Sequence, residues 1–310
     1  MDIHAGLSLA YKSLIGISIG DAFGESFFGE TSSILQHIDN RSIPETRWEF
    51  TDDTVMAIAV YEQLEKRPMQ GIDQDDLALQ FARKHQLDVN RGYGATSRRI
   101  LREIEAGQCW QDVSRGAFDG MGSMGNGAAM RVGPIGACYY DDLAKVKEQA
   151  ALSAEVTHAN PEGIAGAVAV ATAAALAARV ATDGAVYSPE EFILAVSDSV
   201  PGTDTQSKIK KGLAVPYSYH IETVRSILGD GINMTAQDTV PFSIWCAAHN
   251  LHNFEESLWK AVSILGDRDT ICAIVGGITI LSAAHKSIPQ TWMKAVEDIE
   301  TSVFRDRKIG

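Results

Sequence analysis

The stretch "WEFTDDTVMAIAVYEQL" (48–64) places Thr51, Asp52, Asp53 and Thr54 directly before an apolar run at helical spacing. Thr and Asp at the start of a helix accept hydrogen bonds from free backbone N–H groups and offset the helix dipole. Ordinary capping therefore explains one or two of these residues, and Thr54 is expected to cap the helix or to support a ligand. Two adjacent carboxylates exceed what a cap requires.

A second stretch, "LGDRDTICAIVGGITIL" (265–281), repeats the arrangement with Asp267, Asp269 and Thr270 before another apolar helix. If the two helix starts meet, their clustered carboxylates repel one another unless cations lie between them. All-oxygen ligands of this kind suit Mg²⁺ or Mn²⁺ rather than zinc. The alternative is two independent helix caps that never meet.

A glycine-rich segment (120–136) contains Gly120, Gly122 and Gly125 in the GxGxxG spacing of dinucleotide-binding folds. That spacing carries weight only when a strand leads into it, and the preceding "WQDVSRGAFD" has no strand pattern. We instead expect exposed backbone N–H groups here, next to a helix start beyond Asn126, to favour a diphosphate. Arg131 is expected to anchor this loop.

Apolar residues recur mostly three and four positions apart along the chain, which predicts helices throughout and a compact all-α bundle. The alanine-rich stretch 163–178 is shorter than a membrane span and predicts a buried core helix. Because no Pro/Ser-rich linker or charge block divides the chain, we predict one domain over 1–310.

The composition narrows the classes of partner and compartment. A formal net charge of -13 opposes binding to nucleic acid, which relies on Lys and Arg contacts to phosphates. The cysteines are dispersed without a CxxC pair, which suits reduced thiols. The N-terminus lacks the basic region of a signal peptide. These features predict a cytoplasmic protein with no membrane span.

The chain resembles the ADP-ribosylglycohydrolase family, which includes the dinitrogenase reductase-activating glycohydrolases. The resemblance runs from about Leu14 to about Ala284 through the blocks "GISIGDAFGESFFGE", "WEFTDDTVMAIAV", "GNGAAMRVGPIG", "THANPEGIAGAVAVATAAAL" and "GDRDTICAIVGG". It implies a compact orthogonal all-α bundle, two divalent cations (Mg²⁺ or Mn²⁺) and hydrolysis of the bond between ADP-ribose and a modified side chain. The implied metal ligands are Thr51, Asp52, Asp53, Asp267, Asp269 and Thr270.

The same resemblance assigns residues to the substrate. It places Asn126, Gly127 and Ala128 at the diphosphate and ribose, His158 in the ADP-ribose cleft, and the loop 90–99 with Gly92, Tyr93 and Gly94 beside the substrate. Glu25 matches an acidic gate near the metals in some members.

Several positions depart from the family pattern. Asn160 stands where many relatives carry a second His. Where some bacterial members have Asp-Ile-Gly, this chain has Gly92, Tyr93 and Gly94, so a base on that loop does not transfer. Arg268 replaces a small Ser or Thr, and its guanidinium either competes with a metal or points to water.

The resemblance implies hydrolysis at the anomeric carbon of ADP-ribose, with a cation holding ribose hydroxyls and an activated water attacking. Asp53 or Glu25 is the expected base. The "WEFTDDTVM" block favours ADP-ribosyl-arginine on a protein as substrate. The alternatives are an O-linked substrate (ADP-ribosyl-serine or O-acetyl-ADP-ribose) and a binding or immunity-type protein that counters an ADP-ribosylating toxin.

Overall fold

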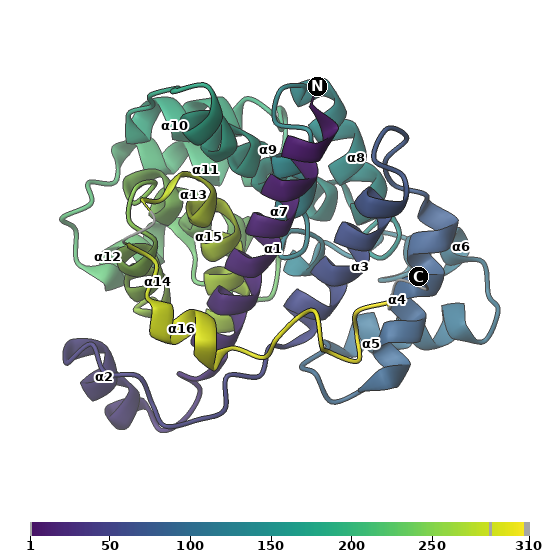
Figure 1. Ribbon diagram of the computed structural model, residues 1–310, viewed down its shortest axis with the longest axis horizontal. Coiled ribbons are helices and arrows are strands. Elements are labelled where there is room, and N and C mark those ends of the chain that lie inside the picture. The colour runs from purple at the N-terminus through teal and green to yellow at the C-terminus, as the bar shows by residue number, and fades with distance from the viewer. Residues whose placement is uncertain (1, 285–286, 307–310) are drawn as a thin grey trace.

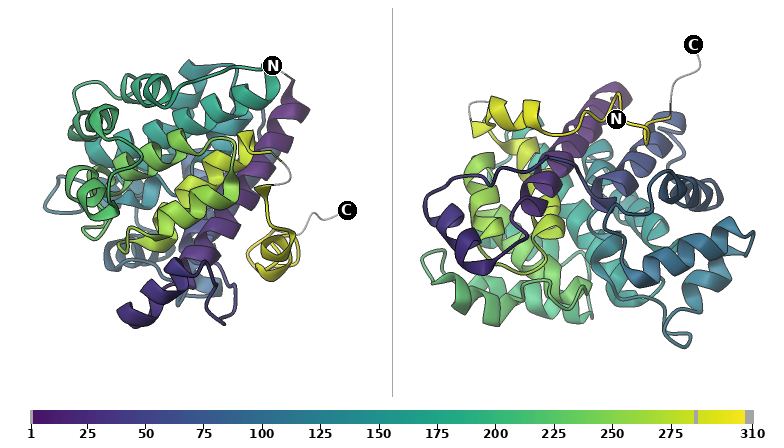
Figure 2. Two further views of the ribbon diagram at one scale, coloured as in Figure 1. Left: turned by 90° about the vertical axis from the view of Figure 1, so that its left-hand side faces the viewer. Right: turned by 90° about the horizontal axis from the view of Figure 1, so that it is seen from below.

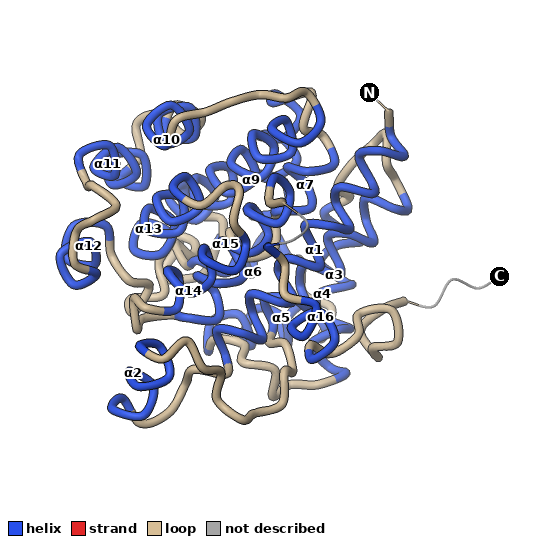
Figure 3. The backbone as a smooth tube through the Cα atoms, turned by 60° about the vertical axis from the view of Figure 1, so that its left-hand side comes forward, coloured by secondary structure: helices blue, strands red, loops and turns tan. Residues whose placement is uncertain are grey.

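The structure, a computed structural model, describes residues 2–284 and 287–306. Within these ranges the chain forms helices and no strand, as the blue and tan tube of Figure 3 shows. This confirms the predicted all-α fold. In chain order the helices are α1 (Ile3–Glu25), α2 (Thr31–Asp39), α3 (Asp52–Lys66), α4 (Gln74–Leu87), α5 (Ala95–Glu105), α6 (Trp110–Arg115), the 3-10 turn η1 (Asn126–Ala128), α7 (Gly133–Cys138), α8 (Leu143–Glu155), α9 (Pro161–Thr182), α10 (Pro189–Ser197), α11 (Asp204–Lys211), the 3-10 turn η2 (Gly212–Ala214), α12 (Ile221–Leu228), α13 (Ala236–His249), α14 (Phe254–Val262), α15 (Arg268–Ser282) and α16 (Gln290–Ala295).

Helix α1 runs through the middle of the molecule, with α15 on one side and α3 on the other (Figure 1). It packs most extensively on α15, and small residues make that approach possible. A Cβ added at Gly20 would lie 2.0 Å from the Cys272 carbonyl oxygen, and one at Gly24 would lie 2.3 Å from the Arg268 carbonyl oxygen. The close contact brings the start of α15 beside the end of α1.

Helix α9 is the long apolar helix predicted over 163–178, and it packs against α7, α8, α13 and α15. Its length and composition alone would allow it to cross a membrane, but most of its apolar stretch is buried inside the protein. It therefore serves as a core helix. The four cysteines are free thiols, in agreement with the absence of a disulfide pattern.

The segment after α16 passes over α1 and reaches α4, as the yellow trace in Figures 1 and 2 shows. It begins with a bridge between Val296 and Trp48, where the Glu297 N–H donates to the Trp48 carbonyl at 2.9 Å. Farther along, Arg305 pairs with Glu62 and Glu65 on α3. The C-terminal segment thus holds the residues before α3 and the body of α3 together.

We predict that Gly20→Ala lowers the free energy of unfolding by about 1–3 kcal/mol, because the new methyl group forces α1 and α15 apart and outweighs the gain in helix propensity. Chemical denaturation followed by circular dichroism measures the change. Gly29→Ala is the control, since a Cβ there meets no atom closer than 3.7 Å. Equal stability of the two variants would contradict this account of the contact.

Candidate metal centre

The start of α3 is held by a buried carboxylate from α1. Asp21, which is 0% exposed, accepts the Thr51 N–H at 2.9 Å, the Thr54 N–H at 3.1 Å and the Thr54 hydroxyl at 2.6 Å. Thr51 itself is the N-cap of α3 and accepts the Asp53 N–H at 3.4 Å. The capping alternative for Thr54 is therefore wrong, and its hydroxyl instead supports Asp21.

The two acidic helix starts meet. The Thr270 hydroxyl on α15 donates to Asp53 Oδ1 on α3 at 3.5 Å. Asp267 is the N-cap of α15, yet its side chain makes no capping hydrogen bond. Asp53 Oδ2 and Asp269 Oδ1 are buried without a hydrogen-bond partner. If the two helix starts were independent caps, they would not contact each other, and their buried oxygens would have hydrogen-bond partners.

These donors fit a hard divalent cation. Carboxylate and hydroxyl oxygens are the ligands that Mg²⁺ and Mn²⁺ prefer, and buried carboxylate oxygens without partners are costly unless something positive binds them. Within residues 2–284 and 287–306 no three His, Cys, Asp or Glu side chains converge as a preformed metal site. The mutual repulsion of the carboxylates opposes such convergence without a cation, and the unpaired oxygens of Asp53 and Asp269 are the groups that a cation would satisfy.

The carboxylates raise one another's pKa. Burial raises the pKa of Asp21 to about 7. The hydrogen bond from Thr54 lowers this pKa in part, and the charge of Asp269 raises it further. Burial, and next the charge of Asp269, raises the pKa of Asp52 well above its usual range. Burial and the charge of Asp21 do the same for Asp53, and burial and Asp269 for Asp267. The site is thus strongly attractive to cations, whether protons or metal ions.

Gly92 lies directly against the acidic start of α3. Its φ is +90°, and a Cβ there would approach Asp52 Oδ1 to 3.1 Å, so glycine meets both the steric and the backbone requirement. Gly92 and Gly94 are exposed. Tyr93, predicted to contact the substrate, is instead 1% exposed and packs edge-on against His85.

Arg91 fastens this loop to the acidic start of α3, a role that sequence reasoning missed. Its carbonyl accepts the Asp52 N–H at 2.5 Å, and its guanidinium donates to the Phe50 carbonyl at 2.8 Å. Asp88 and Glu297 neutralise the guanidinium, at 3.1 and 2.7 Å respectively. Arg91 therefore holds the residues on either side of Thr51 and ties them to the C-terminal segment.

The glycine-rich segment joins the centre through Asn126. Its Nδ2 donates to Asp267 Oδ2 at 2.6 Å and to the Thr239 hydroxyl at 2.9 Å. Beyond Asn126 the chain forms only the single 3-10 turn η1 rather than the start of a longer helix. A Cβ on Gly127 would meet His158 Cε1 at 3.0 Å, so the predicted substrate residues Asn126, Gly127, Ala128 and His158 lie together in this part of the structure.

Two buried basic side chains support this segment. Arg131, which is 0% exposed, donates to the carbonyls of Gly127 at 3.3 Å and Ser153 at 2.7 Å, which confirms that it anchors the loop. His158 Nδ1 and the Thr157 hydroxyl lie 2.7 Å apart. Burial and the charge of Arg131 lower the pKa of His158 to about 3, so its imidazole is neutral near pH 7.

Glu25 ends α1 at the edge of the centre. Glu25 as a whole is exposed, but its carboxyl group is partly buried and feels the charges of Asp269 and Arg268. This partial burial, followed by the charge of Asp269, raises the pKa of Glu25 to about 7, and Arg268 opposes the rise. Glu25 is not among the predicted metal ligands, so it remains free to exchange a proton with the solvent.

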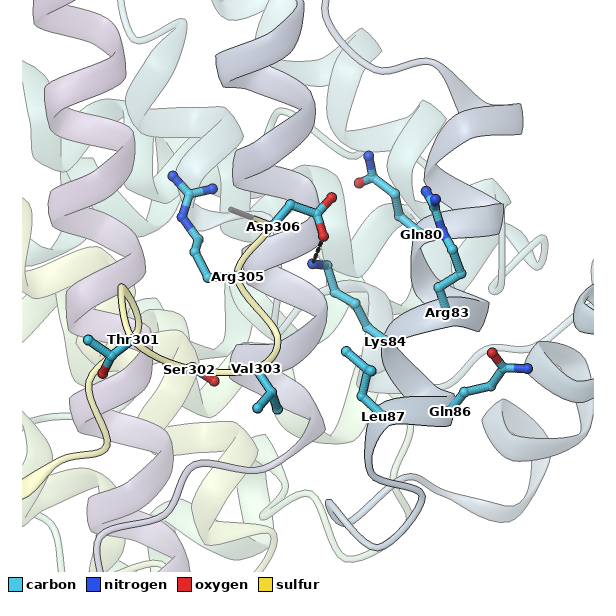
Figure 4. A pocket seen from close by; sticks show the side chains of 10 residues that line it. All are labelled: Gln80, Arg83, Lys84, Gln86, Leu87, Thr301, Ser302, Val303, Arg305 and Asp306. Atoms are coloured by element: carbon cyan, nitrogen blue, oxygen red, sulfur yellow. Dashed lines mark ion pairs between the residues drawn. The ribbon is translucent and has the colours of Figure 1, made fainter. Parts of the chain in front are cut away.

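A pocket of about 560 Å³ lies elsewhere, between α4 and the C-terminal segment (Figure 4). Lys84 points into it toward Asp306 at 3.6 Å and also pairs with Glu62 at 2.8 Å. None of the clustered aspartates lines this pocket. Lys84, Arg305 and Asp306 at this pocket form ion pairs that attach the C-terminal segment, so we place the candidate functional site at the acidic helix starts instead.

Comparison with known proteins connects this arrangement to a family. The model of the family described as ADP-ribosylglycohydrolase matches residues 4–308. The chain is 30% identical to the human ADP-ribosylhydrolase ARH3, over 93% of this chain and 88% of that protein. It is also 30% identical to an uncharacterised protein of Archaeoglobus fulgidus, over 93% of this chain and 91% of that protein.

A solved structure confirms the fold. The chain superimposes on a chain of an "ADP-ribosylglycohydrolase-related protein complex" with a TM-score of 0.66 and 22% identity, covering 95% of this chain and 94% of that one. At this identity the likeness supports the shared helical fold and no finer statement.

We predict that Mg²⁺ or Mn²⁺ raises the melting temperature more at pH 8 than at pH 5. Carboxyl groups whose pKa is raised in the folded state keep protons that the unfolded chain releases. Without metal, the free energy of unfolding therefore falls as the pH rises from about 4, the pKa of an unfolded carboxyl, toward about 7, the raised pKa of Asp21 and Glu25. A cation replaces those protons and stabilises by about 2.7 kcal/mol at one hundred times its dissociation constant.

Thermal denaturation with EDTA and with each cation checks this expectation. Asp53→Asn should shrink the metal-induced rise, whereas Asp39→Asn, an exposed carboxylate at the end of α2, should leave it intact. An equal metal effect in both variants would show that the cation binds away from the two helix starts.

Proposed function

Because the chain belongs to the ADP-ribosylglycohydrolase family, we propose that it is a metal-dependent hydrolase that releases ADP-ribose from a hydroxyl oxygen on a protein side chain. The contact between Thr270 and Asp53 carries the proposal, since it joins two acidic helix starts whose unpaired oxygens fit divalent cations. We propose Thr51, Asp52, Asp53, Asp267, Asp269 and Thr270 as the residues that hold two such ions, either Mg²⁺ or Mn²⁺.

The neighbouring residues suit the rest of ADP-ribose. When bound, divalent cations supply positive charge that orients sugar hydroxyls and makes water more acidic. The turn at Asn126, Gly127 and Ala128 joins this centre through the bond from Asn126 to Asp267, and we propose it for the diphosphate. Neutral His158 beside Gly127 offers a hydrogen-bonding ring rather than a charge.

Hydrolysis of an O-linked substrate adds the oxygen of water to the anomeric carbon and breaks the bond from that carbon to the side-chain oxygen. A proton leaves the water and one reaches the departing oxygen, so a single carboxyl near neutral pKa serves both transfers. We assign the proton transfers to Glu25 rather than Asp53, because Asp53 belongs to the proposed ligand set. The exposed end of α1 lets Glu25 exchange protons with solvent.

The charge of Arg268 favours an oxygen leaving group over arginine. The guanidinium of Arg268 acts electrostatically on Glu25, where the departing group would receive its proton. A cationic guanidinium on the substrate would be repelled there, whereas a neutral serine hydroxyl would not. The arginine substrate expected from the "WEFTDDTVM" block is kept as the second candidate. The relatives' names concern ADP-ribose hydrolysis and give no support to a toxin partner.

The test incubates the purified protein with ADP-ribosyl-serine peptide, ADP-ribosyl-arginine peptide and O-acetyl-ADP-ribose, in Mg²⁺, Mn²⁺ or EDTA. We expect metal-dependent release of free ADP-ribose from the serine peptide, and at least a roughly hundredfold loss in Asp269→Asn because the shared centre is broken. Asp39→Asn serves as the matched control and should retain full activity.

Faster release from arginine than from serine would overturn the proposed linkage and leave the hydrolase proposal standing. No release from any substrate by metal-loaded, folded protein would overturn the hydrolase proposal. Full activity of Asp269→Asn would exclude the start of α15 from the metal centre.

A further inference from the structure

Arg268 lies between two proposed metal ligands, and its side chain binds backbone carbonyls and packs on an aromatic ring. Its Nη1–H donates to the Phe27 carbonyl at 2.6 Å, and its Nε–H donates to the Gly266 carbonyl at 3.3 Å. Its guanidinium carbon lies 4.4 Å from the centre of the Phe28 ring. The side chain therefore reaches from the start of α15 to the turn that follows α1.

That turn, residues 26–29, continues directly from Glu25. The Phe27 N–H donates to the Gly24 carbonyl at 3.1 Å, and the Phe28 N–H donates to the Glu25 carbonyl at 3.2 Å. Phe27 is buried against Phe23 and Trp259. Phe28 is 45% exposed, so its contact with Arg268 forms the outer part of the turn.

The residues on both sides of Glu25 contact Arg268. On the helix side, Gly24 packs on the Arg268 carbonyl so closely that a Cβ would lie 2.3 Å away. On the turn side, the Arg268 side chain binds the Phe27 carbonyl and covers the Phe28 ring. A small residue at position 268 would keep the first contact and lose the second.

We propose that Arg268 is a positioning residue: it fastens the turn 26–29 to α15 and thereby holds the Glu25 carboxyl beside the acidic centre. The inference rests on the proposed function, because Glu25 acts there in proton transfer. A planar guanidinium that donates in two directions and stacks on a ring suits this task, whereas lysine offers one charge without the planar fork.

The test compares Arg268→Ala, Arg268→Lys and Phe28→Ala with the wild type. For Arg268→Ala we expect about a tenfold fall in kcat for release of ADP-ribose, and a much smaller change in KM, because only the proton-transfer group is displaced. In Phe28→Ala, kcat should fall by a smaller factor. In Arg268→Lys, kcat should lie between the values of Arg268→Ala and the wild type. Arg47→Ala, an exposed arginine with 89% side-chain exposure, is the control and should match the wild type.

Combining Arg268→Ala with Glu25→Gln separates the positioning of Glu25 from a nonspecific loss of structure. With no carboxylate left to position, Arg268→Ala should lower kcat no further. The metal-induced rise in melting temperature should also be unchanged in Arg268→Ala. An equal fall of kcat in both backgrounds, or a lost metal effect, would overturn the proposal because Arg268 would then act through the metal ligands.

Amide hydrogen exchange tests the same claim without activity. Exchange at residues 26–29 should speed up in Arg268→Ala and in Phe28→Ala, and should stay at the wild-type rate in Arg47→Ala. Unchanged exchange would overturn the positioning role. If the wild type releases no ADP-ribose from any substrate, the proposed function fails, and this measurement still decides whether Arg268 fastens the turn.

Discussion

The site depends on the packing of one helix, α1, against both acidic helix starts. Through Gly20 and Gly24, α1 approaches the backbone of α15 more closely than any larger side chain would allow. Through Asp21, it binds the backbone and hydroxyl groups at the start of α3. The same helix therefore sets the separation of the two halves, and the contact from Thr270 to Asp53 follows from that geometry.

This arrangement stores electrostatic free energy. Burying several carboxylates together raises their pKa values and lowers stability wherever they must ionise without a counter-charge. The interior offers Arg131 nearby, but burial lowers its pKa to about 9 and its hydrogen bonds go to neutral groups. The charges of Arg98 and Arg268 also act on Asp52 and on Asp269. The pKa values of Asp52, Asp53 and Asp267 nevertheless stay raised, which is the physical reason that a divalent cation suits the site.

The sequence predicted the features that are local and missed those that depend on distant contacts. The helices after Asp53 and Asp269 were predictable, because capping residues and apolar spacing lie within a few positions of each other. The role of Asp21 was not, since the N–H groups that it accepts belong to another helix 30 and 33 residues away. An aspartate inside the apolar face of a helix was the available signal. Arg91 and Arg268 bind backbone carbonyls, and such partners leave no pattern of residue types.

We propose that the starts of α3 and α15 together form one divalent-cation centre. Crystals grown with Mn²⁺, with diffraction data collected on both sides of the manganese absorption edge, would test it most directly. We expect two anomalous peaks between Asp53 and Asp269, each within about 2.0–2.6 Å of carboxylate oxygens, the range for hard cations. Occupied manganese sites elsewhere, with no peak between these two helix starts, would contradict it.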